Sequence, residues 1–306
     1  MALRLEHVET RAWPSSYGAE AKPRMGFFTD TSVCIGCKAC EVACKEWNQI
    51  PATIHGFSGE SYDNTLDLGA NTWRHVAFVE QRKQLDVDPE GGDVDLAGTA
   101  AASAAVAEWG LATYQDGDGM RWLMSSDVCK HCTDAACLEV CPTGSLFRTE
   151  FGTVVVQEDI CNGCGYCVPA CPFGVLDQRE GDGRVWKCTL CYDRLKDDKE
   201  PACAQACPTN SIQYGELEEL RERADARLAQ LTDAGAEGAR LYGADPDDGV
   251  GGFGAFFLLL DVPEAYYLPP DPVDTTRHLR GTWAATLAAA GALAVGLAAT
   301  LIGGRR

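Results

Sequence analysis

The chain has 306 residues, 16 of them cysteine, and a formal net charge of −19. This length allows one or two hydrophobic cores with additional segments around them. The acidic balance argues against nucleic acid as a partner, because binding to a phosphate backbone requires an excess of Lys and Arg on one surface.

The chain begins with a predicted N-terminal extension over residues 1–24. It contains arginines but no apolar run and no twin-arginine pair, so we do not expect an export signal here. Residues 25–80 carry the first cysteine quartet, which has the spacing C-x2-C-x2-C-x3-C and is followed by Lys45. Its members are Cys34, Cys37, Cys40 and Cys44.

An acidic segment rich in Gly and Ala follows over residues 81–120. It is predicted to be an inserted loop with a short helix around residues 100–108, and we assign it no chemistry. Residues 121–183 then carry two further quartets. The second consists of Cys129, Cys132, Cys137 and Cys141, and the third of Cys161, Cys164, Cys167 and Cys171. Between them, residues 147–160 are valine-rich and predict a β-hairpin.

The fourth quartet lies in residues 184–215 and consists of Cys188, Cys191, Cys203 and Cys207. Three cysteines that close a quartet are each followed by Pro and by a similar short motif, at residues 141–146, 171–176 and 207–212. We interpret this internal repeat as a helix terminus followed by a turn and an apolar strand. We expect the fourth cysteine of a quartet to open a helix and to point away from its three neighbours.

The quartets predict iron–sulfur clusters. The first and third have the run by which bacterial ferredoxins hold 4Fe-4S clusters, in which the last cysteine ligates the neighbouring cluster. A disulfide scaffold would require a higher cysteine content in a short chain. Structural zinc is bound by pairs of C-x2-C arms, which would leave the third cysteine of the first and third quartets without a role. All 16 cysteines are therefore candidate ligands of four 4Fe-4S clusters.

The order of the quartets predicts how they pair. The second and third are adjacent and form one two-cluster domain over residues 121–183, which is inserted into a second domain made of residues 25–80 and 184–215. Exchange of the last cysteine then gives four ligand sets: Cys34, Cys37, Cys40 and Cys207 for cluster 1; Cys44, Cys188, Cys191 and Cys203 for cluster 2; Cys129, Cys132, Cys137 and Cys171 for cluster 3; Cys141, Cys161, Cys164 and Cys167 for cluster 4. The predicted fold class is α+β, with two ferredoxin-like domains.

Residues 216–280 are predicted to pack on partner subunits. Residues 216–231 have leucines at helical spacing and indicate an amphipathic surface helix, whereas the apolar run 256–260 fits either a strand or a partner contact. Residues 281–304 contain no charge, and a helix of this length, about 36 Å at 1.5 Å per residue, crosses a bilayer once. Its Ala and Gly content favours close packing against a membrane subunit, and a soluble alanine-rich helix is the alternative.

Several other features are set aside. Gly249, Gly251 and Gly254 match G-x-G-x-x-G, but no strand precedes them and no helix follows, so a dinucleotide site is not expected. His131 stands in a complete quartet and is not needed as a ligand, and His278 lies beside the expected membrane boundary. Four lysines next to cysteine ligands could offset anionic clusters or lie in solvent: Lys38, Lys45, Lys130 and Lys187. No catalytic residue is predicted.

The first quartet and its surroundings, CIGCKACEVACKEWN at residues 34–48, together with the order and spacing of the later quartets, resemble the iron–sulfur subunits of complex iron–sulfur molybdoenzymes. Within that family the chain is most similar to the beta subunit of membrane-bound formate dehydrogenase, over about residues 25–231 and in the terminal span. Relatives in nitrate and dimethyl sulfoxide reductases usually replace the first cysteine of the third quartet, but this chain retains Cys161.

The resemblance implies a non-catalytic electron-transfer subunit. A catalytic alpha subunit with a molybdenum or tungsten pterin would oxidise formate, and a membrane cytochrome b gamma subunit with haem b would pass the electrons to quinone. It also implies an extracytoplasmic soluble part, but a cytoplasmic one stays open because basic residues flank both ends of the span. The alternatives are a relay subunit of another membrane oxidoreductase, such as a hydrogenase or polysulfide reductase, and a free polyferredoxin.

Overall fold

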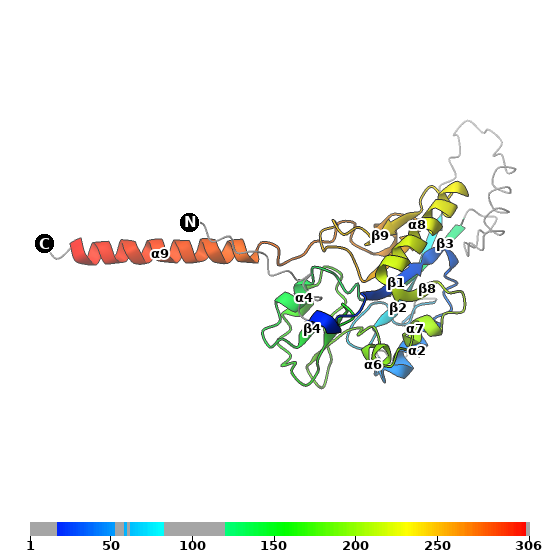
Figure 1. The fold of residues 1–306 in the computed structure, drawn as a ribbon, viewed down its shortest axis with the longest axis horizontal. Coiled ribbons are helices and arrows are strands. Elements are labelled where there is room, and N and C mark those ends of the chain that lie inside the picture. Colours follow the sequence, from blue (N-terminus) through cyan, green and yellow to red (C-terminus); the bar gives the residue numbers. More distant parts are fainter. Residues whose placement is uncertain (1–16, 53–57, 60–61, 83–119, 304–306) are drawn as a thin grey trace, which may run out of the picture.

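The structure is a computed structural model that describes residues 17–52, 58–59, 62–82 and 120–303. It has a body of short helices and small sheets, from which one long helix, α9, extends (Figure 1). The described helices are α2 (Ala39–Trp47), α4 (Ala136–Glu139), α5 (Cys167–Ala170), α6 (Tyr192–Lys196), α7 (Ala202–Gln205), α8 (Leu217–Asp233) and α9 (Leu279–Gly303). Short 3-10 turns occur at Gly18–Glu20, Thr31–Val33 and Pro263–Tyr266.

A four-stranded sheet with the order β8-β1-β10-β9 forms one part of the body. Its strands are β1 (Met25–Asp30), β8 (Ile212–Glu216), β9 (Arg240–Tyr242) and β10 (Ala255–Leu259). β1 runs antiparallel to β8 and parallel to β10, which come from distant parts of the sequence. Every residue of β10 is buried, so the apolar run predicted near residues 256–260 is an internal strand and not a partner contact.

Close approach of the backbone explains a glycine in β1. The amide of Phe27 donates a hydrogen bond to the carbonyl oxygen of Gly254 at 2.8 Å. A Cβ atom at the neighbouring Gly26 would lie 2.2 Å from that same oxygen, well inside van der Waals contact. Glycine at residue 26 therefore allows β1 to meet the segment that leads into β10.

The predicted amphipathic helix is α8, and it packs on the four-stranded sheet (Figure 1). It buries Leu217, Leu220, Ala224 and Leu231 and leaves most of its charged side chains exposed. The apolar residues recur every three or four positions, as expected for a helix with one face in the core. The structure confirms the interpretation of this segment.

Three pairs of strands complete the body. β2 (Arg74–Arg82) pairs antiparallel with β3 (Met120–Val128), β4 (Leu146–Arg148) with β5 (Val154–Val156), and β6 (Asp177–Gln178) with β7 (Val185–Trp186). The β4–β5 pair is the predicted hairpin within residues 147–160, with its first strand starting one residue earlier. The predicted helix at residues 100–108 lies outside the described residues.

Four short helices that contain or adjoin the cysteine quartets pack together in two pairs. α2, with part of the first quartet, packs against α7, with part of the fourth, and α4 packs against α5. The expectation that the fourth cysteine opens a helix is wrong for all four quartets. Cys44 lies inside α2, whereas Cys141, Cys171 and Cys207 follow the end of α4, α5 and α7. Proline after each of them accounts for this, since the residue before proline is disfavoured in the α conformation.

Candidate metal centres

None of the 16 cysteines forms a disulfide bond, and all of them lie in the described part of the chain. Cys37 and Cys164 are exposed, and the other cysteines are buried or half-buried. A framework of free thiols, most of them buried or half-buried, does not fit a disulfide scaffold. It fits sites at which the sulfur atoms bind a metal.

The first predicted ligand set comes together from two distant segments. Cys34, Cys37, Cys40 and Cys207 line one cavity, together with Val76, Ser126 and Ile212. The hydroxyl oxygen of Ser126 lies 3.2 Å from the sulfur of Cys40. The quartets that are first and last in the sequence therefore share this cavity.

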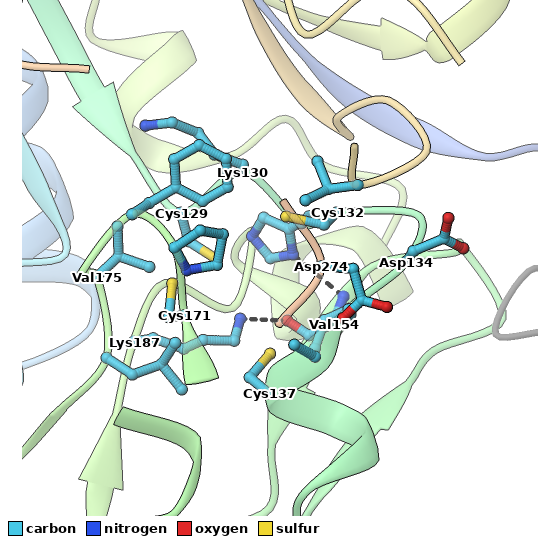
Figure 2. Close-up of a pocket in the computed structure, with 17 residues that line it drawn as sticks. Cys129, Lys130, Cys132, Asp134, Cys137, Val154, Cys171, Val175, Lys187 and Asp274 are labelled. Atoms are coloured by element: carbon cyan, nitrogen blue, oxygen red, sulfur yellow. Dashed lines mark hydrogen bonds between the residues drawn. The ribbon is translucent and has the colours of Figure 1, made fainter. Parts of the chain in front are cut away.

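The third predicted set lines a more enclosed cavity, which Figure 2 shows. The sulfur atoms of Cys129, Cys132, Cys137 and Cys171 lie around one shared space. Lys187 lines the same cavity. Three of the cysteines come from the loop before α4 and from α4 itself, and the fourth follows α5.

The fourth predicted set combines three cysteines of the third quartet with one of the second. Cys141, Cys161, Cys164 and Cys167 line a further cavity, with Leu146, Val156 and Val185 as apolar walls. One glycine in this loop is sterically required: Gly163 has φ +71°, and a Cβ there would lie 2.3 Å from the carbonyl oxygen of Gly183.

The members of the second set are also neighbours. The pKa of Cys44 is raised well above its usual value by burial and by the nearby charges of Cys203, Cys188 and Cys191. The side-chain amide of Asn48 lies 3.7 Å from the sulfur of Cys44 and 3.9 Å from that of Cys191. A cysteine of the first quartet thus lies with three of the fourth.

Burial makes these thiols unfavourable as free thiolates. It raises the pKa of Cys40, Cys137 and Cys188 to about 12. Such groups are protonated at neutral pH and are poor nucleophiles, whereas a bound metal ion deprotonates a coordinating thiol. Structural zinc is bound by pairs of C-x2-C arms, which does not fit the three closely spaced cysteines of the first and third quartets.

Buried cations accompany the cysteines. Lys130 and Lys187 are each 1% exposed. The ammonium group of Lys187 donates hydrogen bonds to the carbonyl oxygens of Val154 and Cys188, and its charge lowers the pKa of Cys137 against the larger effect of burial. Lys130 forms an ion pair with Asp127.

The other two lysines near ligands bind protein groups at the edge of the body. Lys38 forms ion pairs with Glu41 at 3.1 Å and with Asp63 at 3.2 Å. Lys45 donates a hydrogen bond to the carbonyl oxygen of Asn71 at 2.8 Å. The ammonium groups of Lys38 and Lys45 therefore already bind oxygen atoms of the protein.

The sequence analysis missed Arg74, which is 2% exposed and whose pKa is raised by nearby cysteines in spite of the lowering effect of burial. Because Arg74 lies more than 25 residues from the nearest quartet along the chain, cysteine spacing gave no signal for it. It reaches the cysteines through the pairing of β2 with β3 and the packing of α2 on β2.

The structure places the two histidines and the glycine motif that the sequence analysis considered and did not assign to a site. Nδ1 of His131 accepts a hydrogen bond from the amide of Val154 at 3.1 Å, and burial lowers the pKa of His131 well below its usual value. His278 is exposed next to α9. The glycine motif at residues 249–254 leads into β10 and not into a helix.

Comparison with known proteins agrees with this chemistry. Two family models described as a 4Fe-4S dicluster domain match residues 33–145 and 120–217. The formate dehydrogenase iron–sulfur subunit of Haemophilus influenzae is 37% identical over 85% of this chain and 73% of its own length. The iron–sulfur subunit of the nitrate-inducible formate dehydrogenase of Escherichia coli is 37% identical over 92% of this chain and 85% of its own length.

A more distant relative is the B subunit of the anaerobic dimethyl sulfoxide reductase of Escherichia coli, which is 32% identical over 65% of this chain and 76% of its own length. The formate dehydrogenase subunits match a larger share of this chain. The chain is a non-catalytic electron-transfer protein and belongs to the family of formate dehydrogenase iron–sulfur subunits.

Proposed function

We propose that this chain carries electrons through four 4Fe-4S clusters, from a catalytic subunit that oxidises formate at a molybdenum or tungsten pterin to a membrane cytochrome b subunit that reduces quinone. The observation that carries the proposal is the gathering of 16 cysteines into four groups of four. The named formate dehydrogenase relatives support the choice of formate. Each cluster, when bound, accepts and donates one electron.

The proposed ligand sets follow the cavities and the neighbouring thiols. Cluster 1 takes Cys34, Cys37, Cys40 and Cys207; cluster 2 takes Cys44, Cys188, Cys191 and Cys203; cluster 3 takes Cys129, Cys132, Cys137 and Cys171; cluster 4 takes Cys141, Cys161, Cys164 and Cys167. In each set three cysteines come from one quartet and one from another, which is the exchange typical of two-cluster ferredoxins.

Electrostatic effects between cysteines of different sets support a single row of clusters. The charge of Cys203 in set 2 raises the pKa of Cys40 in set 1, although burial has the larger effect. In the same way, burial has the larger effect on the pKa of Cys188 in set 2, and the charge of Cys129 in set 3 raises this pKa further.

The row continues through Cys167 in set 4, whose charge contributes to the raised pKa of Cys137 in set 3. The order is therefore 1-2-3-4. The two exposed cysteines, Cys37 and Cys164, belong to the two end sets, where electrons can be exchanged with other subunits.

The packing of the helices supports the proposed domains. Residues 121–183 form the inserted two-cluster domain, in which α4 packs against α5. Residues 25–80 and 184–215 form the second domain, in which α2 packs against α7. We assign residues 1–24 as an N-terminal extension, residues 81–120 as an acidic insertion, and residues 216–280 as a segment that packs on partners.

The long helix supports anchoring in a membrane. Within α9, residues Gly281–Leu301 have a mean hydropathy of 1.9 and are not buried against the rest of the described chain. Three of its glycines have no other side chain or distant backbone within 4 Å of where a Cβ would lie, so they offer surface for a close helix–helix contact: Gly281, Gly291 and Gly296. We assign the helix as a single span that contacts lipid and the cytochrome b subunit, with the soluble part on the extracytoplasmic side.

The test is purification of the native complex without oxygen, followed by mass spectrometry of its subunits and metal analysis. The expected result is at least sixteen iron atoms per copy of this chain, four for each cluster, in addition to the iron of haem b, with one subunit that contains molybdenum or tungsten and another that contains haem b. Far fewer iron atoms would refute the four-cluster assignment.

The same experiment separates the alternatives. A nickel-containing partner would replace formate dehydrogenase by a hydrogenase, and a chain that purifies alone would indicate a free carrier. Potentiometric titration followed by EPR adds a second criterion. Because formate is a low-potential donor, at least one cluster should have a strongly negative potential, and four high-potential clusters would contradict the choice of formate.

A further inference from the structure

Arg74 is a buried cation with no carboxylate partner in the part of the chain that the structure describes. It lies at the start of β2, and one guanidinium nitrogen, Nη1, donates hydrogen bonds to the carbonyl and hydroxyl oxygens of Ser126, both at 3.1 Å. The guanidinium carbon lies 4.8 Å from the centre of the Phe27 ring. These contacts hold the side chain in one place but do not neutralise its charge.

Two of its donor nitrogens have no acceptor. Nε and Nη2 of Arg74 are buried without a hydrogen-bond partner in the protein. Buried donors are almost always paired, and a buried charge without a counter-charge is strongly unfavourable. The position therefore requires an anionic acceptor that the polypeptide itself does not provide.

The neighbouring groups identify that acceptor. Four cysteines lie close enough to Arg74 to raise its pKa when they are thiolates, in the order Cys203, Cys40, Cys188 and Cys44. One of them, Cys40, belongs to proposed set 1 and the other three belong to set 2. Ser126 links the same groups, because its hydroxyl oxygen contacts both Nη1 of Arg74 and the sulfur of Cys40.

We infer that Arg74 is a positioning residue shared by clusters 1 and 2: its two unpaired nitrogens, Nε and Nη2, donate hydrogen bonds to cluster sulfur, and its charge raises the reduction potentials of both clusters. Reduction adds negative charge to a cluster, and a nearby cation with hydrogen bonds to sulfur favours the reduced form. One arginine thereby keeps two consecutive members of the electron-transfer row easier to reduce. This inference rests on the proposed function, and in particular on the ligand sets.

The test compares two variants in the purified complex, Arg74→Met and Arg74→Lys. Methionine removes the charge and all donors, whereas lysine keeps the charge but not the two N–H groups of the guanidinium fork. For Arg74→Met the reduced-to-oxidised ratio at a fixed potential should fall at least tenfold in two of the four clusters, a shift of about 59 mV for a one-electron couple. Arg74→Lys should shift the same two clusters in the same direction by less.

The measurement is EPR-monitored potentiometric titration, with iron content determined on each sample. Arg121→Met is the matched control. Arg121 lies on the same two-stranded ribbon, opposite Gln81 and seven residues along β2 from Arg74, or about 23 Å at 3.3 Å per residue. It pairs with Asp261, so its replacement should leave all four potentials unchanged.

Unchanged potentials in an Arg74→Met complex that retains its iron would overturn the inference, and so would equal shifts of all four clusters. If Arg74→Met loses iron, Arg74→Lys decides, because unchanged potentials there would refute hydrogen bonding by the guanidinium group. Failure of the proposed function is recognised separately, since it would appear as low iron in the unaltered complex.

Discussion

Glu41 connects the helix that carries the first quartet to the strand that carries Arg74. It lies in α2 between Cys40 and Cys44 and is 6% exposed. Its carboxylate accepts a hydrogen bond from the amide of Val76 in β2 and forms an ion pair with Lys38. Replacing Glu41 with alanine removes the acceptor of a buried amide, so α2 should separate from β2 more easily.

The expected cost follows from the burial of Val76, which is 1% exposed. An unsatisfied buried donor costs about 1–3 kcal/mol, which corresponds to a roughly 5- to 150-fold larger population of the locally open state. Hydrogen–deuterium exchange of the peptide that contains Val76, measured by mass spectrometry on the native complex, should be faster by a factor in this range. Loss of iron to a chelator should accelerate in the same variant.

Glu41→Gln is the matched control. The glutamine side chain keeps an oxygen that can accept the amide hydrogen of Val76, but it loses the ion pair with the partly exposed Lys38, which is worth at most about 1 kcal/mol. Exchange near Val76 should therefore stay close to that of the unaltered protein. If Glu41→Ala also exchanges at the unaltered rate, Glu41 does not hold α2 against β2.

Three further predictions concern other parts of the chain. Cys164→Ser should lower the iron content by about four atoms and stop quinone reduction while the catalytic subunit still reduces an artificial acceptor; full quinone reduction would contradict the serial row. Leu220→Ala, at a fully buried position of α8, should destabilise the body by about 2–5 kcal/mol and lower the temperature at which the iron–sulfur absorbance is lost, whereas Leu297→Ala at an exposed position of α9 should not. Burial raises the pKa of Asp63, but hydrogen bonding and charge from His75, together with other groups, bring it below its usual value of about 3.9. The ionised carboxylate of Asp63 therefore stabilises its loop above pH 4, and this stabilisation is lost as the pH falls further. In the unaltered protein, amide exchange at residues 65–66, corrected for intrinsic rates, should therefore depend on pH in this range. In Asp63→Asn it should become independent of pH.

The sequence predicted the chemistry of the site well, because iron–sulfur ligation depends on short-range spacing. Three thiols within one loop must lie close together whatever the rest of the chain does. The helix α8 and the hairpin β4–β5 were predicted for the same reason, since their periodicity is local. The proposed exchange of Cys44 and Cys207 between distant quartets could be predicted only by analogy with ferredoxins.

The sheet could not be predicted in this way. β1 pairs with β8 and β10, which lie about 190 and 230 residues later in the chain, and no local pattern specifies such partners. The apolar run that forms β10 fits a buried strand, a buried helix segment or a contact surface equally well. Arg74 shows the same difficulty, because its position next to the cysteines depends on the tertiary contact of β2 with α2.

The buried cations also bear on how this chain folds. Arg74 and Lys187 are buried, and neither forms an ion pair with a carboxylate among the described residues. Lys187 binds carbonyl oxygens that cannot neutralise it, and Arg74 keeps two donors without acceptors. Without anionic clusters this packing would bury uncompensated positive charge next to protonated thiols. Bound anionic clusters would supply the missing counter-charge, so we expect removal of the clusters to destabilise the body, as in other proteins whose metal sites form only in the folded state.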